Sequence, residues 1–589
     1  MRYRKMTAAA AAAALALCSM NASAESNQVF SETVPGHNAP MIVDVIVKDG
    51  AVSSILVDDR ESPGAGKRAL AILKKEILEN QTVNVDAVTG ATITSSAFVG
   101  AVKENLRKAG LDLKKFAQPV PQKALKDHYE SELVIVGGGG AGLAAAAAAV
   151  EAGGKVIIIE KLGFLGGSTA ISGGGYNAVD PDRQKRQGIK DSLQKHFDDT
   201  MRGGHQKNNP ELVRYLVDHA PETMHWLEVK GVHFSPFVST IVGGLYPRGH
   251  STAAGGGGFA YTSWLEKFIR AYPGQVQIFT DTTARRLVKD QNGRVTGVEA
   301  EHQGKKVVFS AQKGVVITTG GFASNVALRQ KLNTGPWKEK ILDSSIGSTN
   351  SFKASQGDGL KLAADVGADL IDLSYIQLHP GGTPGTGIMS SWPSGRNRIF
   401  VNVNGERFVN EDAPRDELCK AIFAQPQSKY WVVMNKLRLP SKDTVIGGMA
   451  IGEILKLGKA YKADTIEELA EKTGMDAGKL KSSIAMYNDV ASGKVKQDRF
   501  GFERSMSIDA PMTEGPYFAT MLVPAVHHTM GGIRINSRTQ VLDADGKVIP
   551  GLFAAGEVTG GVHGDNRVGG NGIADAMVFG RLAGTEALK

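Results

Sequence analysis

A glycine-rich turn between a short apolar run and an alanine-rich run constrains this chain more than any other feature. Leu133–Val136 is expected to form a buried strand, and Gly137, Gly139 and Gly142 follow it with Gly-x-Gly-x-x-Gly spacing. The first glycine permits a tight turn, the second lets the backbone approach a phosphate, and the third lets a helix pack closely on the strand. The N-terminus of that helix offers free N–H groups and partial positive charge. This pattern predicts a pyrophosphate-binding turn.

The residues after the turn complete a strand–turn–helix–strand unit. The helix is expected to run to Ala152, and a second strand over Lys155–Ile159 ends at Glu160, 18 residues after Gly142. A carboxylate at this place can accept hydrogen bonds from ribose hydroxyls. Strand, helix and acidic residue together favour a dinucleotide site over a merely structural glycine turn, and they predict a Rossmann-like α/β fold.

A second apolar strand that ends in a glycine and an acid, Gly551–Glu557, lies near the C-terminus. Two-segment sites of this kind indicate FAD, bound non-covalently, rather than NAD. Two further glycine-rich stretches, 166–169 and 173–175, are expected to lie along the flavin part of the cofactor. The residues predicted to contact FAD are Gly137, Gly139, Ala141, Gly142, Glu160, Ser168, Thr169, Gly173, Gly174, Asp358, Glu557, Gly572 and Ile573.

The chain has 589 residues, which is too many for one hydrophobic core. A stretch from about 375 to 515, with two helical segments near Thr465–Thr473 and Ala477–Ala491, interrupts the glycine-rich pattern. A small α+β unit precedes the glycine-rich turn. Its strands are expected at Met41–Val47 and Val52–Val57, and its helices at Lys67–Asn80 and Ser95–Ala109. The predicted organisation is a signal peptide (1–24), an FMN-binding domain (25–120), an FAD-binding domain (121–374), a capping domain (375–515) and the rest of the FAD-binding domain (516–589).

The first 24 residues have the pattern of a secretory signal. Arg2, Arg4 and Lys5 precede a short apolar stretch, and small residues before Ala24 offer a cleavage site. The apolar stretch is too short to span a bilayer, and cleavage lowers the net charge from +8 to +5. An uncleaved anchor or a simple N-terminal helix is the alternative. We expect a periplasmic protein.

Only two cysteines, Cys18 and Cys419, occur in the sequence. The mature chain would keep one of them, so it cannot form an internal disulfide, attach haem or hold an Fe–S cluster. Redox chemistry is therefore expected to use organic cofactors or a partner. Without a block of lysine and arginine, nucleic acid is not an expected partner.

The segment Asp86–Thr92 reads Asp-Ala-Val-Thr-Gly-Ala-Thr. It resembles the motif of the FMN-binding domains found in sodium-pumping and electron-transfer complexes. The resemblance implies that a flavin transferase esterifies Thr92 with the phosphate of FMN. The helix expected to begin near Ser95 would favour the negative charge of that phosphate. The alternative is a β-turn followed by a capped helix.

Residues 130–589 resemble the soluble fumarate reductase and urocanate reductase family. The short segments that carry this resemblance keep the family's order and spacing; they are 356–359, 376–380, 407–411, 415–416, 527–532 and 555–567. The resemblance implies hydride transfer from reduced flavin to one alkene carbon and proton delivery to the other.

The same resemblance assigns roles to four residues of the site. It makes Arg415 the proton donor, His528 and Arg567 the binders of a substrate carboxylate, and His379 a contact at the substrate's other end. A planar guanidinium can pair with both carboxylate oxygens. Outside this pattern, an arginine after a proline is usually a surface residue and adjacent histidines are often structural. Metal binding by His527, His528 and His563 lacks supporting carboxylate or cysteine spacing, so no metal is expected.

The sequence departs from the fumarate-reducing pattern after His379-Pro380. The stretch 388–398 contains no glutamate, and Trp392 lies near the expected place of that glutamate. Burying a second substrate carboxylate there without a partner would cost roughly several kcal/mol. Leu378 and Trp392 also fit an imidazole pocket poorly, although Trp392 is equally explained as core packing. Arg396 or Arg398 is a candidate replacement for the missing proton relay.

These features predict a periplasmic respiratory reductase of an α,β-unsaturated monocarboxylate, cinnamate-like or acrylate-like, that takes electrons through FMN from a cytochrome or a quinol-linked protein. Reduction of fumarate or urocanate, the reverse dehydrogenation, and a flavin electron carrier without its own substrate are the alternatives. The exact acid, the electron donor, the direction in vivo and the oligomeric state do not follow from the sequence.

Overall fold

The computed structural model describes residues 28–121, 125–253, 256–350, 354–390, 397–439, 441–443, 445–446, 449–504 and 510–589. The predicted signal peptide with Cys18, together with Trp392 and Arg396, lies outside the described residues. The chain divides into two compact units, one built from residues up to 59, 70–86 and 93–122, and one from 60–69, 87–92 and 123–589.

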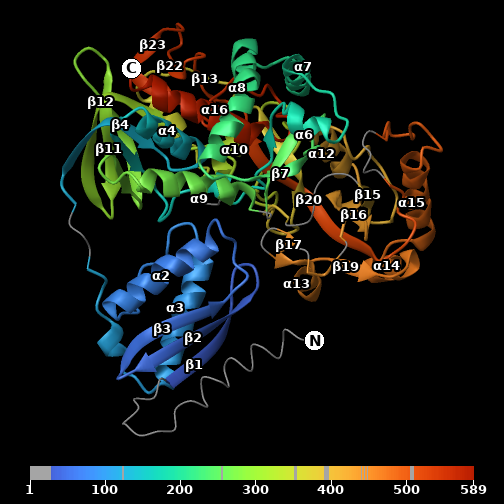
Figure 1. The fold of residues 1–589 in the computed structure, drawn as a ribbon, viewed down its shortest axis with the longest axis horizontal. Coiled ribbons are helices and arrows are strands. Elements are labelled where there is room, and N and C mark those ends of the chain that lie inside the picture. Colours follow the sequence, from blue (N-terminus) through green and yellow to red (C-terminus); the bar gives the residue numbers. More distant parts are fainter. Residues whose placement is uncertain are drawn as a thin grey trace. The chain divides into compact units, whose positions relative to one another are not determined.

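The N-terminal unit is a three-stranded antiparallel sheet with two helices (Figure 1). Its elements are β1 (Gln28–Pro35), β2 (Pro40–Lys48), β3 (Ala51–Asp58), α2 (Gly66–Asn80), α3 (Thr92–Lys108) and η1 (Leu113–Phe116). Side chains of β2 alternate, so that Met41, Val43, Val45 and Val47 are buried. Asn105 of α3 donates its Nδ2 hydrogen to the carbonyl of Val43 at 2.8 Å, which places α3 against the buried face of the sheet.

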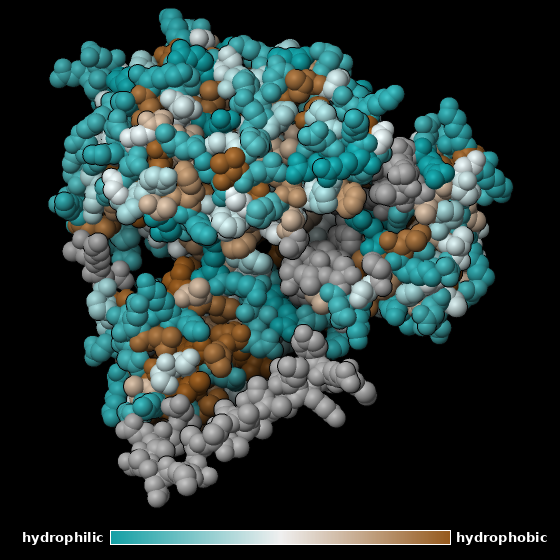
Figure 2. Space-filling view, viewed as in Figure 1, coloured by the Kyte–Doolittle hydropathy of each residue, from teal (hydrophilic) through white to brown (hydrophobic). Residues whose placement is uncertain are grey.

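The other face of this sheet carries exposed apolar side chains. Val29 is 60 % exposed, Ile42 40 % and Leu56 52 %. Figure 2 shows apolar side chains gathered on this unit. An antiparallel sheet that covers its core on one side usually has a polar outer face, so these apolar side chains depart from the usual pattern.

The second unit is built on a mixed, largely parallel sheet with the order β10-β11-β12-β4-β5-β9, extended by β23 and β22. Its strands are β4 (His128–Val136), β5 (Val156–Ile159), β9 (Val276–Phe279), β10 (Thr282–Lys289), β11 (Val295–His302), β12 (Lys305–Ile317), β22 (Gln540–Leu542) and β23 (Val548–Ala554). All four residues of β5 are buried, as expected for a strand covered on both faces. The helices around this sheet include α4 (Gly140–Glu151), α8 (Pro210–Val229), α9 (Gly257–Arg270) and α16 (Asn571–Glu586) (Figure 1).

A smaller sheet with the order β14-β20-β16-β15 carries the capping region. Its strands are β14 (Ile376–Gly382), β15 (Arg398–Asn402), β16 (Tyr430–Asn435), β19 (Tyr461–Ala463) and β20 (Tyr517–Thr529), and its helices are α12 (Arg415–Phe423), α14 (Ile466–Thr473) and α15 (Ala477–Ala491). Ile399, Val433, Leu480 and Tyr487 belong to a separate hydrophobic cluster under α14 and α15.

Shorter elements connect these layers. They are α5 (Gly167–Ala170), β6 (Tyr176–Asn177), α6 (Pro181–Lys185), α7 (Leu193–Gly203), β7 (Phe234–Ser239), β8 (Gly249–Thr252), α10 (Val326–Leu332), α11 (Asp358–Ala364), β13 (Leu370–Ile371), η3 (Pro426–Ser428), β17 (Val445–Ile446), β18 (Met449–Ala450), α13 (Ile451–Lys456) and β21 (Gly532–Ile533). Among the described helices, none combines the length and the apolar character needed to cross a membrane.

The predicted strand–turn–helix–strand unit and the α/β class are confirmed, and α14 and α15 lie where two helices were predicted. The predicted start of the second helix near Ser95 is wrong, because α3 begins at Thr92. The strand β1 was not predicted, since its mixed polar sequence lacks a clear apolar period. The domain boundaries remain predictions.

The close packing of α4 on its turn gives a test of the fold. A Cβ atom at Gly142 would lie 1.9 Å from the carbonyl oxygen of Gly137, so Gly142→Ala should destabilise the flavin-free protein by about 1–3 kcal/mol. Gly139→Ala is the matched control, because its Cβ would meet nothing within 4 Å. Urea unfolding of both variants checks this, and equal stabilities would contradict the described packing.

Candidate active site

A cavity of about 800 Å³ opens at the carboxyl ends of the parallel strands. Val136 ends β4, Ile159 ends β5, and Thr318 and Ala555 follow β12 and β23; all four line the cavity. Ligands of open α/β sheets bind at this edge. Every residue predicted to contact FAD lines the same cavity except Gly142, which packs α4 on the turn.

The glycine turn leaves room for a ligand at one position. Gly137 has φ +105°, and a Cβ there would lie 2.7 Å from the carbonyl of Thr318. Gly139, the N-cap of α4, also lines the cavity, and a Cβ there would meet open space. The turn is therefore closed on the protein side and open on the cavity side, which fits a bound pyrophosphate.

Glu160 ties this turn to the second strand. Its Oε2 accepts a hydrogen bond from the N–H of Gly138 at 2.7 Å, and its Oε1 accepts one from Leu162 at 2.8 Å. Burial raises the pKa of Glu160 above its usual range. Both carboxylate oxygens thus accept hydrogen bonds from the backbone, and the contact with ribose hydroxyls remains a prediction.

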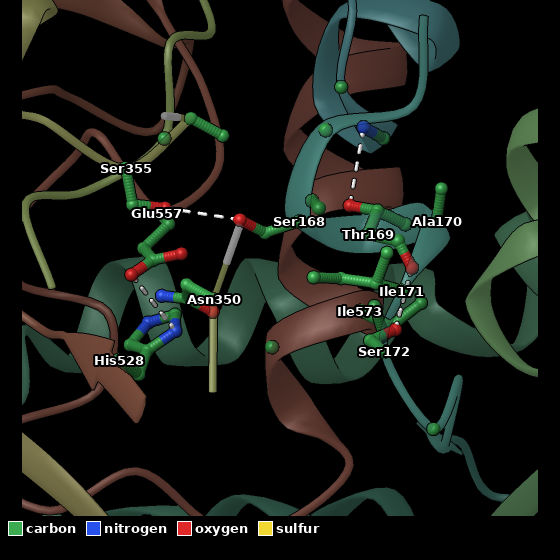
Figure 3. A pocket seen from close by; sticks show the side chains of 18 of the residues that line it. Ser168, Thr169, Ala170, Ile171, Ser172, Asn350, Ser355, His528, Glu557 and Ile573 are labelled. Atoms are coloured by element: carbon green, nitrogen blue, oxygen red, sulfur yellow. Dashed lines mark hydrogen bonds and ion pairs between the residues drawn. The ribbon is translucent and has the colours of Figure 1, made fainter. Parts of the chain in front are cut away.

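Several hydroxyl groups line the cavity near the glycine turn (Figure 3). Thr169 accepts a hydrogen bond from the N–H of Gly140 at 3.3 Å, and the hydroxyls of Ser168 and Ser355 lie 3.1 Å apart. Asp358, the first residue of α11, forms an ion pair with Lys161. These groups present donors and acceptors to the cavity from several segments.

The start of α16 forms another wall of the cavity. Gly570 caps this 16-residue helix with φ +94°, and Gly572 and Ile573 in its first turn line the cavity. Four backbone N–H groups of such a turn have no partner within the helix. Two helix N-termini, those of α4 and α16, therefore border the cavity, as suits an anionic cofactor.

The four residues predicted to act on the substrate line this cavity as well. Arg415 is the first residue of α12, His379 lies in β14, His528 lies in β20 and Arg567 precedes α16. All four are at most 8 % exposed. The structure thus brings together side chains that are as much as 188 positions apart, and their individual roles remain predictions.

Neutral groups hold Arg415 in place. Its Nε donates to the carbonyl of Val242 at 2.9 Å, and one terminal nitrogen donates to Oε1 of Gln377 at 2.9 Å. The amide nitrogen of Gln377 donates in turn to the carbonyl of Arg567 at 2.7 Å and to Asn566 at 3.1 Å. Gln377 therefore links the segments of both arginines, a function that its place in the sequence motif did not reveal.

The two guanidinium groups lack a directly paired carboxylate within the described part of the chain, and Glu557 and Asp575 act on Arg567 only through longer-range charge. Neither Arg415 nor Arg567 forms an ion pair with a described carboxylate, and Nε of Arg567 is buried without a hydrogen-bond partner. Burial, together with the charge of Arg567, lowers the pKa of Arg415 well below its usual range. Burial lowers the pKa of Arg567 to about 10. Two buried, unmatched cations in one cavity indicate a site for an organic anion.

Three histidines border the same space. Nδ1 of His379 accepts a hydrogen bond from the N–H of Gly381 at 2.9 Å, and Thr349 lies 2.6 Å from Nδ1 of His527. Nδ1 of His528 lies 3.7 Å from Oε1 of Glu557, and its Nε2 is buried without a described partner (Figure 3). Burial is the main cause that lowers the pKa of each histidine well below its usual range. Their rings are therefore neutral and can donate one hydrogen bond each.

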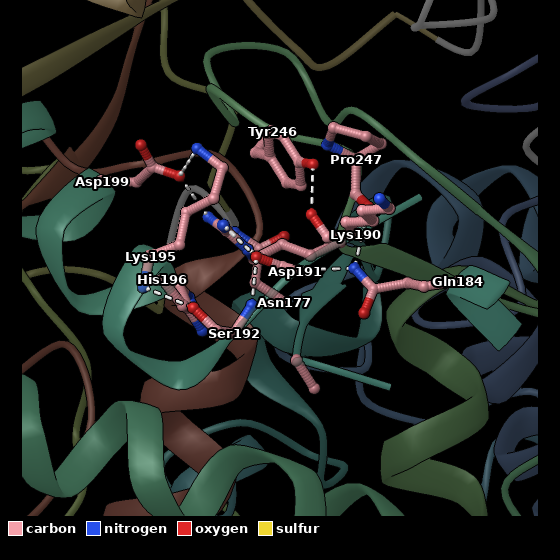
Figure 4. Close-up of polar contacts among 12 residues, drawn as sticks. Asn177, Gln184, Lys190, Asp191, Ser192, Lys195, His196, Asp199, Tyr246 and Pro247 are labelled. Atoms are coloured by element: carbon pink, nitrogen blue, oxygen red, sulfur yellow. Dashed lines mark hydrogen bonds and ion pairs between the residues drawn. The ribbon is translucent and has the colours of Figure 1, made fainter. Parts of the chain in front are cut away.

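The segment that holds Arg415 is itself anchored by a buried ion network (Figure 4). Arg248 is fully buried and donates to Asp191 at 2.8 and 2.9 Å and to Asp199 at 2.9 Å. The sequence does not reveal this network, because the two aspartates lie 49 and 57 positions away from Arg248. The network fixes the end of the loop that begins at Val242.

The structure corrects one expectation about the pocket. Leu378 is fully buried in the main hydrophobic core and does not line the cavity, so its apolar side chain does not count against an imidazole-bearing substrate. Of the two candidate relay arginines, Arg398 lines the cavity and Arg396 lies outside the described residues. Sequence reasoning missed Tyr430 and Arg438, which also line it. Within the described ranges, no group of three or more histidine, cysteine or acidic side chains is arranged to hold a metal ion.

Known families match both units. The FAD binding domain model matches residues 132–573, and the FMN-binding domain model matches residues 36–107. The chain is similar to the urocanate reductase of Eggerthella lenta, with 35 % identity over 96 % of this chain and 93 % of that protein. It is also similar to the NADH:acrylate oxidoreductase of Vibrio harveyi, with 32 % identity over 94 % of this chain and 60 % of the larger protein.

A solved structure, the open conformation of a flavocytochrome c3 fumarate reductase, covers 78 % of this chain and 78 % of its own, with a TM-score of 0.59 and 34 % identity. The fold and the site thus define a flavin-dependent oxidoreductase. The chain belongs to the FAD-binding family that includes the soluble fumarate reductases and urocanate reductases, and it carries an additional N-terminal FMN-binding domain.

The open side of the glycine turn predicts a separation between folding and flavin binding. Gly139→Ala should leave the thermal midpoint of the flavin-free protein unchanged, because its Cβ points into open space. The same methyl group would occupy the place of the pyrophosphate, so FAD affinity should fall by at least about tenfold, equivalent to 1.4 kcal/mol. Flavin titration followed by fluorescence measures this. Unchanged FAD affinity would show that the cofactor does not approach this turn.

Glu557 predicts a pH-dependent stability. Burial raises its pKa from 4.5 to about 7 in the folded protein. Its contribution is therefore complete below pH 4.5 and is lost as the pH rises to about 7, a decline of about 3 kcal/mol. The difference in unfolding free energy between the flavin-free wild type and Glu557→Gln, measured by urea unfolding at pH 4.5 and pH 8, isolates this decline. A pH-independent difference would contradict it.

Proposed function

We propose that this protein reduces the carbon–carbon double bond of an α,β-unsaturated carboxylate. The observation that carries the proposal is the pair of buried guanidinium groups, Arg415 and Arg567, that line the predicted FAD cavity without a described carboxylate partner. A substrate carboxylate would supply the missing negative charge. A protein that only carried electrons would have no use for this costly arrangement.

The side chains that line the site have different functions toward the substrate. Arg567 and the Nε2–H of His528 bind the carboxylate, and His379 contacts the substrate away from it. FAD, when bound, supplies the hydride that adds to the β-carbon. Arg415 gives a proton to the α-carbon, so that one hydride and one proton convert the alkene to the saturated acid. The lowered pKa of Arg415 suits it to this step, since burial weakens its hold on the proton.

The substrate class is a monocarboxylate with an apolar or aromatic tail, such as an acrylate-like or cinnamate-like acid. Met389, Phe400, Tyr430 and Leu522 give the cavity apolar and aromatic walls, and the stretch 388–398 offers no glutamate. The similarity to a protein named for acrylate supports this class. Urocanate is the second candidate, favoured by the similarity to a urocanate reductase over nearly the whole chain; fumarate is the third.

The N-terminal domain accepts the electrons. Thr92 is exposed at the first residue of α3, and the phosphate of an attached FMN would lie at the positive end of this 17-residue helix. A flavin transferase would form the phosphoester bond to Thr92. We propose a periplasmic location on the basis of the predicted signal peptide, with a cytochrome or a quinol-linked protein as donor in anaerobic respiration. Recovery of the mature chain from the periplasm, starting at Glu25, would test the location.

Turnover and the role of Arg415 can be tested with a reduced dye. Dye oxidation by the flavinylated wild type should depend on an unsaturated acid, with acrylate, methacrylate, cinnamate, urocanate and fumarate as candidates. Arg415→Gln should lower kcat by about 10²- to 10⁴-fold, because the proton donor is lost. Arg286→Gln, at an exposed ion pair on β10, is the control. Acid-independent dye oxidation would favour a flavin carrier, and full activity of Arg415→Gln would refute the proposed proton transfer.

Covalent attachment of FMN has its own test. Thr92→Ala should abolish the flavin fluorescence that stays with the protein after denaturation, while Ser96→Ala, an exposed hydroxyl in the same helix, should retain it. Both proteins should still release FAD on denaturation. Flavin that remains bound to denatured Thr92→Ala would place the linkage elsewhere.

A further inference from the structure

A second cationic region lies in the cavity apart from the Arg415–Arg567 pair. Arg398 is the first residue of β15, Arg438 follows β16, and both line the cavity. The aromatic rings of Phe400 and Tyr430 line the same part of it. None of the chemistry assigned above uses these two arginines.

Arg398 is buried without an evident charge partner. It is 7 % exposed, and its buried Nε has no hydrogen-bond partner. No described carboxylate forms an ion pair with it. The carboxylate of Glu411 is held by the guanidinium of Arg407 at 2.7 and 2.9 Å and accepts a further hydrogen bond from the N–H of Phe400. Glu411 is therefore committed elsewhere.

Arg398 and the aromatic residues near it form part of the cavity wall. Its guanidinium carbon lies 4.7 Å from the ring centre of Phe400, and the hydroxyl of Tyr430 donates to the carbonyl of Pro380 at 3.0 Å. Leaving a buried guanidinium N–H without an acceptor is unfavourable, and the nearby charge of Arg438 adds to the cost. A ligand oxygen would remove both penalties.

His379 lines the same cavity as both pairs of arginines. The charges of Arg415, Arg567 and Arg398 all lower its pKa, after burial as the first cause. Because Arg567, His379 and Arg398 line one cavity, a substrate whose carboxylate is held at Arg567 can extend its tail past His379 toward Arg398. The tail then lies against Phe400 and Tyr430.

We infer that Arg398 binds an oxygen-bearing group at the far end of the substrate, either the hydroxyl of an aromatic ring or a second carboxylate. The inference rests on the proposed function: a phenolic hydroxyl would refine the monocarboxylate class, whereas a second carboxylate would replace it with a fumarate-like dicarboxylate. A guanidinium can pair with both oxygens of a carboxylate, and one of its N–H groups can donate to the single oxygen of a phenolic hydroxyl. Arg398 is in this view a specificity-determining residue and not the proton relay that its position in the sequence suggested.

Steady-state kinetics of the flavinylated full chain can separate the two sources of oxygen. The first pair of acceptors is cinnamate and 4-hydroxycinnamate, and the second is acrylate and fumarate. In one pair, the acid with the distal oxygen should have a kcat/KM at least about tenfold higher than its partner, because an unmatched buried donor penalises the analogue without the oxygen. Arg398→Met should bring that ratio close to one. Arg398→Lys should give an intermediate ratio, and the surface variant Arg286→Met should keep the wild-type ratio.

A preference in the first pair identifies a phenolic hydroxyl as the distal group, and a preference in the second identifies a carboxylate. A wild type without preference in either pair overturns the inference. So does an equal loss of turnover for all acceptors in Arg398→Met with an unchanged ratio, the result expected of a proton relay. If the wild type reduces none of the unsaturated acids, the proposed function itself fails. If Arg398→Met does not fold, the ratio measured with Arg398→Lys decides.

Discussion

Arg415 is held by hydrogen bonds to neutral groups, and the chemistry of the cavity depends on the absence of a negative charge at these positions. A carboxylate in place of the Val242 carbonyl or of Gln377 would neutralise the guanidinium and raise its pKa. A carbonyl and an amide fix its position equally well but leave its charge unmatched. The cavity therefore keeps a strong attraction for an anion, and the pKa of Arg415 stays well below its usual range.

The position of Arg415 depends on segments that are distant in the sequence. Gly243 has φ +68°, and a Cβ there would lie 2.6 Å from Cγ of Arg415, so the loop and the arginine fit only without a side chain at this position. The carbonyl of Gly243 also accepts the N–H of Gly569 at 2.8 Å, close to Arg567. The ion network of Arg248 then secures the same loop at its other end. Rigid support of this kind gives a site its geometry before the substrate arrives.

Local patterns in the sequence were sufficient to predict the parts of the site that depend on the backbone. The turn at Gly137–Gly142 and the strands beside it follow from apolar runs and from glycine's small size, and they appear where they were predicted. The residues selected by resemblance to a family line one cavity, and their roles remain predictions. The functions of Gln377 and Arg248 could not be predicted, because each depends on partners that only the tertiary fold brings near. Leu378 was expected to affect the substrate pocket, but the alternation of side chains along its strand directs it into the core.

The histidines explain how so many cations fit into one buried space. His379, His527 and His528 adjoin Arg415 and Arg567, and a positive charge on any of them would add repulsion to the cost of burial. Burial keeps all three neutral, and the hydrogen bond from Gly381 leaves the Nε2–H of His379 free to donate. The cavity thus obtains additional hydrogen-bond donors without additional charge. Donors of this kind can orient a carboxylate whose charge the arginines already balance, so the two residue types contribute orientation and charge separately.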